Sequence, residues 1–197
     1  DKGVLNASGL SASQGENVET WTDQSGSSND LLQPSASNQP VFESSSLNSF
    51  PGLGFDGSNR FFTTDLSSSF TASAPLHFYA VSQFASSGEQ TLVSLGDDNN
   101  TNTLSISKDT DDTYYSFSQN GKRTGPALNL SGQIISSFYD NTTLYHRLFL
   151  NGVEQIVDDL TGPVFTNGVL NTGRSKDGTL YFEGELSEFI MYRKELN

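Results

Sequence analysis

The chain lacks cysteine, has few basic residues and contains no long apolar run. Without cysteine there are no disulfide bonds, zinc–thiolate sites or thiol nucleophiles. The 10 Lys and Arg residues stand against 23 Asp and Glu residues, which gives a net charge of −13. We therefore expect no nucleic-acid partner, because binding to phosphates needs basic patches. No apolar segment approaches the roughly 20 residues that a membrane-spanning helix needs, so we also expect no insertion into a membrane.

The sequence also lacks a convincing amphipathic helix, and its apolar residues alternate with polar residues over short segments. Turn residues separate these segments, and Asn151-Gly152 is the strongest hairpin signal because both residues tolerate positive φ. The predicted strands include 76–84, 90–95, 103–107, 113–117, 134–139, 144–150, 153–157, 179–182 and 186–192. Many short strands without a repeat or a linker predict an all-β fold, an antiparallel jelly-roll β-sandwich that forms one domain over residues 1–197.

The densest acidic segments flank the predicted strand 103–107. Asp97, Asp98 and Asn100 precede this strand, and Asp111 and Asp112 follow it. Closely spaced carboxylates repel one another, and a ligand set made only of oxygen suits calcium. We therefore predict that Ca²⁺ is held by these loops. The alternative is that they are solvated turns, because Asp and Asn are also favoured turn residues.

Four tyrosines, two of which adjoin acidic turns, are the candidate ligand platform. The candidates are Tyr114, Tyr115, Tyr139 and Tyr145, and Arg123 beside the Asn120-Gly121 turn is a candidate partner for a ligand carboxylate. Tyrosines beside a calcium ion would suit a sugar or a peptide terminus. The alternative is that the tyrosines are half-buried packing residues and that Arg123 is a solvated turn residue.

Three blocks of sequence carry a resemblance to a known family. They are 18–26 (VETWTDQSG) with Asn29-Asp30 and Gln39-Pro40, then 51–57 (PGLGFDG), and finally Gly173-Arg174 with 182–192 (FEGELSEFIMY). Together they resemble the bacterial laminin-G-like (concanavalin A-like) jelly-roll domains of large surface and secreted proteins. The resemblance implies a module that binds glycans, peptides or proteins, often through calcium. The matching blocks are structural, so the resemblance assigns no ligand-binding residue.

Glu183, Glu185 and Glu188 are the one constellation typical of catalysis. Related jelly-roll glycosidases carry carboxylates at alternate positions of one strand, and retaining hydrolysis needs two of them about 5 Å apart. Glu183 and Glu185 share a strand face, whereas Glu188 leaves that face unless a β-bulge intervenes. We expect no catalysis here, with Glu188 forming structural hydrogen bonds and Glu183 solvated.

The remaining candidates have ordinary explanations. His77 and His146 are the only histidines, lie far apart and fall within predicted strands, which is too little for a serine triad or a histidine metal site. Trp21 lies inside a structural block, so we expect it to pack on the core rather than to stack on a sugar.

These observations predict a non-enzymatic, calcium-dependent ligand-binding module of a bacterial surface adhesin. We expect it to recognise a glycan or an exposed peptide on another cell, and to adjoin further domains of a larger chain. The acidic surface, rich in neutral polar residues, is typical of extracellular proteins, so we place it outside the cell or at the cell surface. The alternative is a polysaccharide-active enzyme domain or its carbohydrate-binding module.

Overall fold

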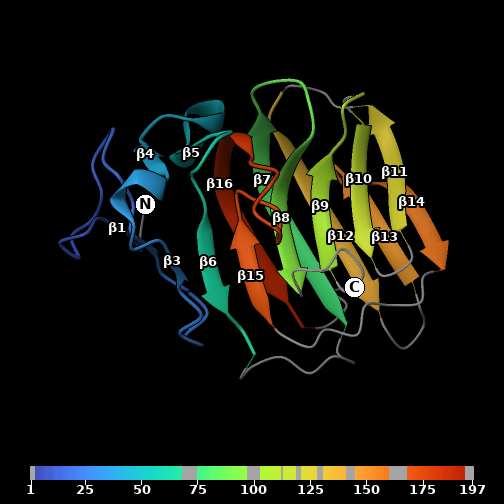
Figure 1. The fold of residues 1–197 in the computed structure, drawn as a ribbon, viewed down its shortest axis with the longest axis horizontal. Coiled ribbons are helices and arrows are strands. Elements are labelled where there is room, and N and C mark those ends of the chain that lie inside the picture. The colour runs from blue at the N-terminus through green and yellow to red at the C-terminus, as the bar shows by residue number, and fades with distance from the viewer. Residues whose placement is uncertain are drawn as a thin grey trace.

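The protein forms two antiparallel sheets that lie face to face (Figure 1). The computed structural model describes residues 3–67, 75–96, 103–111, 113–118, 121–127, 131–140, 145–159 and 168–193. The nine-stranded sheet has the order β1 (Val4–Leu5), β2 (Thr20–Trp21), β3 (Leu31–Leu32), β6 (Phe62–Asp65), β15 (Val169–Thr172), β8 (Gln90–Gly96), β9 (Thr103–Lys108), β10 (Thr113–Ser118) and β11 (Gly121–Ala127). The seven-stranded sheet has the order β14 (Val153–Asp159), β13 (Tyr145–Leu150), β12 (Gln133–Asp140), β7 (Leu76–Phe84), β16 (Glu183–Tyr192), β5 (Gly52–Asp56) and β4 (Val41–Glu43).

Only two short 3₁₀ helices occur in the described residues, η1 (Ala36–Asn38) and η2 (Leu47–Ser49). Neither of these two helices is long and apolar enough to cross a membrane. The predicted all-β jelly-roll sandwich is confirmed.

The core lies between the two sheets and is rich in phenylalanine. Phe182 is fully buried, and its ring centroid lies 4.9 Å from that of Phe84 and 5.4 Å from that of Phe55. Phe78 and Leu186 join the same cluster. Because alternate residues of a strand point to opposite faces, the residues between these core positions face outward. That alternation determines which side chains of the seven-stranded sheet point away from the core.

Two parts of the strand prediction differ from the structure. Residues 179–182 contain only an isolated bridge between Tyr181 and Arg174. The reason is the preceding turn, where the Asp177 carboxylate accepts the backbone N–H of Thr179 at 3.2 Å. The second difference is in strands that the sequence did not predict, among them the short central strand β15 and the edge strand β11.

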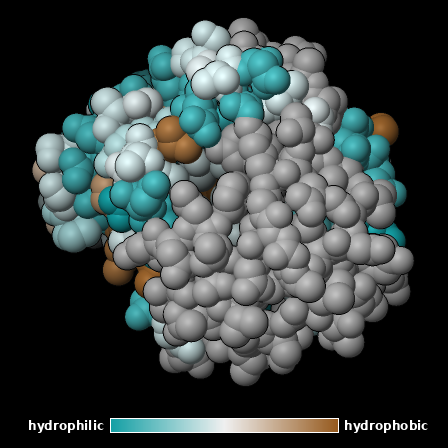
Figure 2. Space-filling view, turned by 45° about the vertical axis from the view of Figure 1, so that its right-hand side comes forward, coloured by the Kyte–Doolittle hydropathy of each residue, from teal (hydrophilic) through white to brown (hydrophobic). Residues whose placement is uncertain are grey.

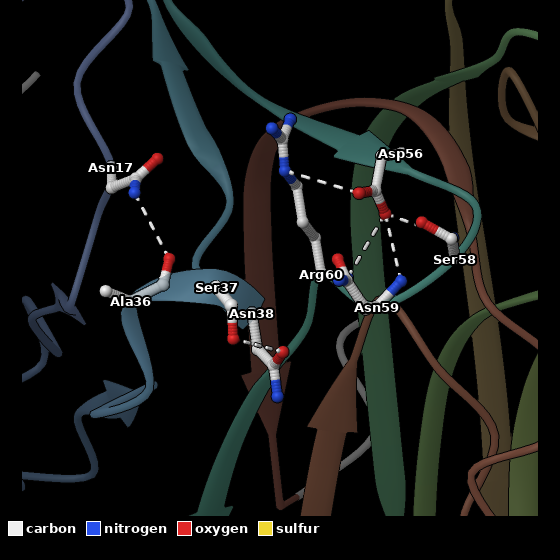
Figure 3. Close-up of polar contacts among 8 residues, drawn as sticks. All are labelled: Asn17, Ala36, Ser37, Asn38, Asp56, Ser58, Asn59 and Arg60. Carbon is white, nitrogen blue, oxygen red and sulfur yellow. Dashed lines mark hydrogen bonds and ion pairs between the residues drawn. The ribbon is translucent and has the colours of Figure 1, made fainter.

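Asp56 holds the loop that follows β5 (Figure 3). Its Oδ1 accepts the backbone N–H groups of Ser58, Asn59 and Arg60 at 3.0, 3.1 and 3.2 Å. The guanidinium of Arg60 forms an ion pair with Oδ2 at 3.6 Å. Partial burial raises the pKa of Asp56, but these N–H donors outweigh that effect and hold the pKa below its ordinary value.

A β-bulge in β16 determines what the outer face of the seven-stranded sheet presents. Leu186 pairs with Ser82 of β7, but Glu188, two positions on, pairs with the adjacent Val81. Ser187 is the extra residue. The bulge therefore shifts the alternation, so that Glu188 faces outward and Phe189 faces the core.

Candidate functional site

The register of β12, β7 and β16 places nine side chains in a three-by-three array on the outer face of the seven-stranded sheet. We call this array the outer patch. Its rows, each running from β12 through β7 to β16, are Ile134, Val81 and Glu188; then Ser136, Tyr79 and Ile190; then Phe138, His77 and Tyr192. The outer patch thus joins segments that lie more than a hundred positions apart in the sequence.

Aromatic rings form one end of the outer patch. The His77 ring stacks on the Tyr79 ring with 4.3 Å between centroids, and the Phe138 centroid lies 5.4 Å from that of His77. The Tyr192 ring stands edge-on to Tyr79 at 6.4 Å. His77 and Phe138 are buried beneath this end, whereas Tyr192 is 39% exposed and Ile134, at the other end, is 50% exposed. A ligand on the sheet would therefore meet Tyr192, Tyr79 and aliphatic side chains first.

His77 carries an unsatisfied polar atom into this cluster. Its Nδ1 lies 3.3 Å from the hydroxyl of Tyr79, but its buried Nε2 has no hydrogen-bond partner within the described part of the chain. Burial lowers the pKa of His77, so its ring is neutral at neutral pH. An unmade hydrogen bond at a buried nitrogen is costly, which is unusual for a residue with a purely structural role.

A cleft of about 1230 Å³ adjoins the outer patch. Its walls include Val81, Ile134, Glu188, Ile190 and Tyr192 of the patch itself. The other lining residues come from the loop that contains η2, from residues 22–29 and from the inner faces of both sheets, and include Phe50, Pro51, Trp21, Asn29 and Leu31. The cleft follows the part of β16 beyond Leu186, where pairing with β5 has ended.

Trp21 both packs against the core and lines the cleft. It is partly buried and packs on the core, with its ring centroid 6.5 Å from that of Phe62, as predicted. It also lines the cleft. Elsewhere, on the face that Figure 2 shows, the described residues are mostly hydrophilic with a few isolated hydrophobic ones.

The three glutamates of β16 come onto one face, but two of them have other partners. The bulge places Glu188 on the face of Glu183 and Glu185. The hydroxyl of Ser86 donates to Glu183, and that of Ser46 donates to Glu185. Glu188 is exposed. The expected roles are thus exchanged: Glu183 is hydrogen-bonded and Glu188 meets solvent, because the bulge turns Glu188 away from the sandwich.

Most of the predicted calcium ligands cannot be placed. Asp97, Asp98, Asn100 and Asp112 lie outside the described residues. Asp111 is exposed, and its Oδ1 accepts the N–H and the hydroxyl of Thr113 at 3.1 and 2.6 Å. These bonds from Thr113 lower the pKa of Asp111. Within the described ranges, no group of three or more His, Cys, Asp or Glu side chains is arranged to hold a metal. Calcium binding stays a prediction.

The predicted ligand-binding residues fall on both sheets. Tyr114 and Tyr115 lie in β10, and Arg123 lies opposite Ser116 in β11, all in the nine-stranded sheet. Tyr145 lies in β13 of the other sheet, opposite Asp140. Tyr139, the further platform candidate, is instead fully buried in the core.

Tyr79 and Tyr192 are not among the ligand contacts predicted from the sequence. The signal in the sequence was the alternation within 76–84, where His77, Tyr79 and Val81 occupy the positions between core residues. That alternation marks them as outward-facing. It does not show that Tyr192 joins them.

No protein-family model matches the sequence, and no curated protein matches it. Among solved structures, the carbohydrate-binding module CBM40 of the Ruminococcus gnavus IT-sialidase, bound to α2,3-sialyllactose, superimposes with a TM-score of 0.60 at 15% identity, over 74% of this chain and 91% of that one. A Trypanosoma rangeli sialidase gives a TM-score of 0.61 at 11% identity, over 85% of this chain and 29% of that one. A GH54 α-L-arabinofuranosidase gives 0.66 at 11% identity, over 90% and 47%. At these identities the likeness shows the fold alone, a jelly-roll β-sandwich of the concanavalin A-like type.

Proposed function

We propose that the chain is a non-catalytic glycan-binding module, with the outer patch and the adjoining cleft as its saccharide site. The observation that carries the proposal is the aromatic and aliphatic surface beside a large cleft, formed by the exposed Tyr192 and Ile134 and the partly exposed Tyr79 and Ile190. Tyrosine offers a sugar an apolar ring face together with a polar hydroxyl. A few polar groups around an apolar surface are the usual composition of a ligand site.

The polar groups of the site suit a ligand with many hydroxyls. Glu188 is exposed and accepts hydrogen bonds, and the cleft is also lined by Asn29, Asn48 and Asn151, whose amides both donate and accept. The CBM40 module with the same fold was solved with a bound sialyllactose, which supports a glycan as the class of ligand. An exposed peptide is the alternative ligand, and aromatic and aliphatic side chains favour a sugar over it.

The test is a calorimetric screen of oligosaccharides, followed by Tyr192→Ala. Truncation of a central aromatic contact typically costs 1 kcal/mol or more of binding energy, so we expect a loss of affinity of about fivefold to thirtyfold. Leu10→Ala is the matched control, because Leu10 is 65% exposed and does not line the cleft. Equal affinities of the two variants for a bound glycan would place the site elsewhere.

The finer parts of the function are also proposals. We propose that calcium, held by the loops around residues 97–102 and 109–112, orders the module, and that the module belongs to an extracellular bacterial adhesin. The concentration of Asp and Asn in those loops supports the calcium proposal. Binding should then fail in the presence of a chelator and return when calcium is added.

A polysaccharide-active enzyme is the second candidate, and the bulge in β16 is the observation that favours it. It brings Glu188 onto the face that carries Glu183 and Glu185. The serine partners of Glu183 and Glu185 favour a structural role for both carboxylates. Reducing-sugar assays on a panel of polysaccharides decide the question: an activity that Glu183→Gln and Glu188→Gln both abolish would establish the enzyme.

A further inference from the structure

We infer that the outer patch accepts neutral saccharides and rejects anionic ones such as sialylated glycans. This inference rests on the proposed function. It concerns the chemical class of the ligand. It differs from the anionic, sialylated ligand that one would assign to this chain by transferring the ligand of the CBM40 structure bound to sialyllactose.

Carboxylates dominate the charge on this face of the sheet. Glu188 belongs to the outer patch and is exposed, and Glu185 and Glu183 continue along the same strand in the same outward phase. The serines that donate to Glu183 and Glu185 are uncharged, so neither hydrogen bond brings a positive charge to this face.

The two described arginines near the patch already have partners. Arg147 pairs across the strands with Phe138 and so lies at the border of the patch, but it forms an ion pair with Glu154 at 3.6 Å. Arg193 lines the end of the cleft and already has a partner of its own. An acidic sugar on the patch would therefore find no described arginine that is free to pair with it.

The cost to an anionic ligand follows from the spacing of the patch. Neighbouring outward positions along a strand are about 7 Å apart, so a ligand carboxylate over Ile190 would lie at about that distance from Glu188. Between effective dielectric constants of about 80 and about 20, one such repulsion weakens binding about threefold to fiftyfold. A neutral sugar avoids this cost, because its hydroxyls donate hydrogen bonds to the same carboxylate.

The experiment compares matched neutral and acidic ligands by calorimetry at low and at high salt. The probes are lactose with α2,3-sialyllactose, and xylo-oligosaccharides with and without a glucuronic acid branch. We expect the neutral member of a bound pair to be preferred about tenfold at low salt, with a smaller preference at high salt because salt screens the repulsion. Glu188→Gln should reduce the ratio of the affinity for the neutral ligand to that for the acidic ligand at least threefold.

Asp65→Asn is the matched control for the loss of one charge. Asp65 lies at the end of β6 in the other sheet, where its carboxylate accepts the N–H of Ser67 at 2.8 Å, and asparagine keeps that acceptor. It should leave the preference unchanged. An acidic ligand that binds as well as its neutral partner, or a preference that Glu188→Gln does not alter, would overturn the inference while the glycan-binding proposal stands. Failure of every saccharide to bind would overturn both.

Discussion

Replacement of Asp56 by alanine should destabilise the protein by removing the acceptor that holds residues 57–60. Three backbone N–H groups and one guanidinium converge on this carboxylate (Figure 3). A hydrogen bond contributes about 1 kcal/mol net, and an exposed ion pair contributes less than about 1 kcal/mol. The Asp56 side chain is 30% exposed, so water replaces part of what is lost. We expect a decrease of about 2 kcal/mol in the free energy of unfolding, or about 4–8 °C in Tm for a chain of this size.

Two further variants grade the effect. Asp56→Asn keeps the Oδ1 acceptor and loses only the charge, so we expect less than half of the decrease. Asp30→Ala removes one backbone hydrogen bond, from the N–H of Asp23 at 2.8 Å, and should cost about 1 kcal/mol. The decrease in the free energy of unfolding should therefore be largest for Asp56→Ala, which loses several bonds and a charge, and smaller for Asp56→Asn and Asp30→Ala.

The pH dependence gives an independent check. The pKa of Asp56 is lowered in the folded state, so its contribution to stability is present above the unfolded pKa of about 3.9 and is lost as the pH falls through the folded pKa. The difference between wild type and Asp56→Ala should thus shrink in acid. Urea denaturation from neutral pH to below about pH 3 measures it. The reasoning would be refuted by a cost below about 0.5 kcal/mol at neutral pH, the range of ordinary surface substitutions, or by a cost that does not change with pH.

Three other outcomes are expected. Calcium added to chelator-stripped protein should bind stoichiometrically and raise Tm, since a ligand of the folded state alone stabilises it; no heat and no shift would mean that the acidic loops are ordinary turns. Burial lowers the pKa of His77 in the folded state, so protonation of His77 favours unfolding as the pH falls below about 6.5. His77→Phe should therefore make the free energy of unfolding fall less steeply with decreasing pH. Equal slopes of the free energy of unfolding against pH for the wild type and the variant would contradict this. Phe182→Ala should cost about 3–5 kcal/mol in urea denaturation, because its ring fills the core between Phe55 and Phe84.

Long alternating strands were predictable from the sequence, whereas short central ones were not. β7 has the limits predicted for it, Leu76–Phe84, because its core residues alternate strictly with outward ones. The Asn151-Gly152 turn is confirmed, with φ of 49° and 79° at its two residues. β15 has only four residues and three of them are buried, so it shows no alternation that would predict a strand.

The outer patch depends on information that one sequence does not carry. Tyr79 and Tyr192 meet because β16 lies beside β7, and strand order is a property of the whole sandwich rather than of either segment. The sheet face on which Glu188 lies depends on the β-bulge at Ser187, and the spacing of the glutamates in the sequence does not determine whether a bulge occurs. The acidic loops were conspicuous in the sequence, but most of their residues lie outside the described part of the chain.

The extra residue at Ser187 also determines which changes of length β16 can tolerate. Deletion of Ser187 would remove the bulge and leave Leu186 facing the core and Glu188 facing outward, whereas deletion of one residue beyond Glu188 would turn the outward residues that follow it into the core. Substitutions in the outer patch leave this phase unchanged, so its chemistry can diversify one side chain at a time. In evolutionary terms, the length of β16 beyond Glu188 should be far more constrained than the identity of its outward residues.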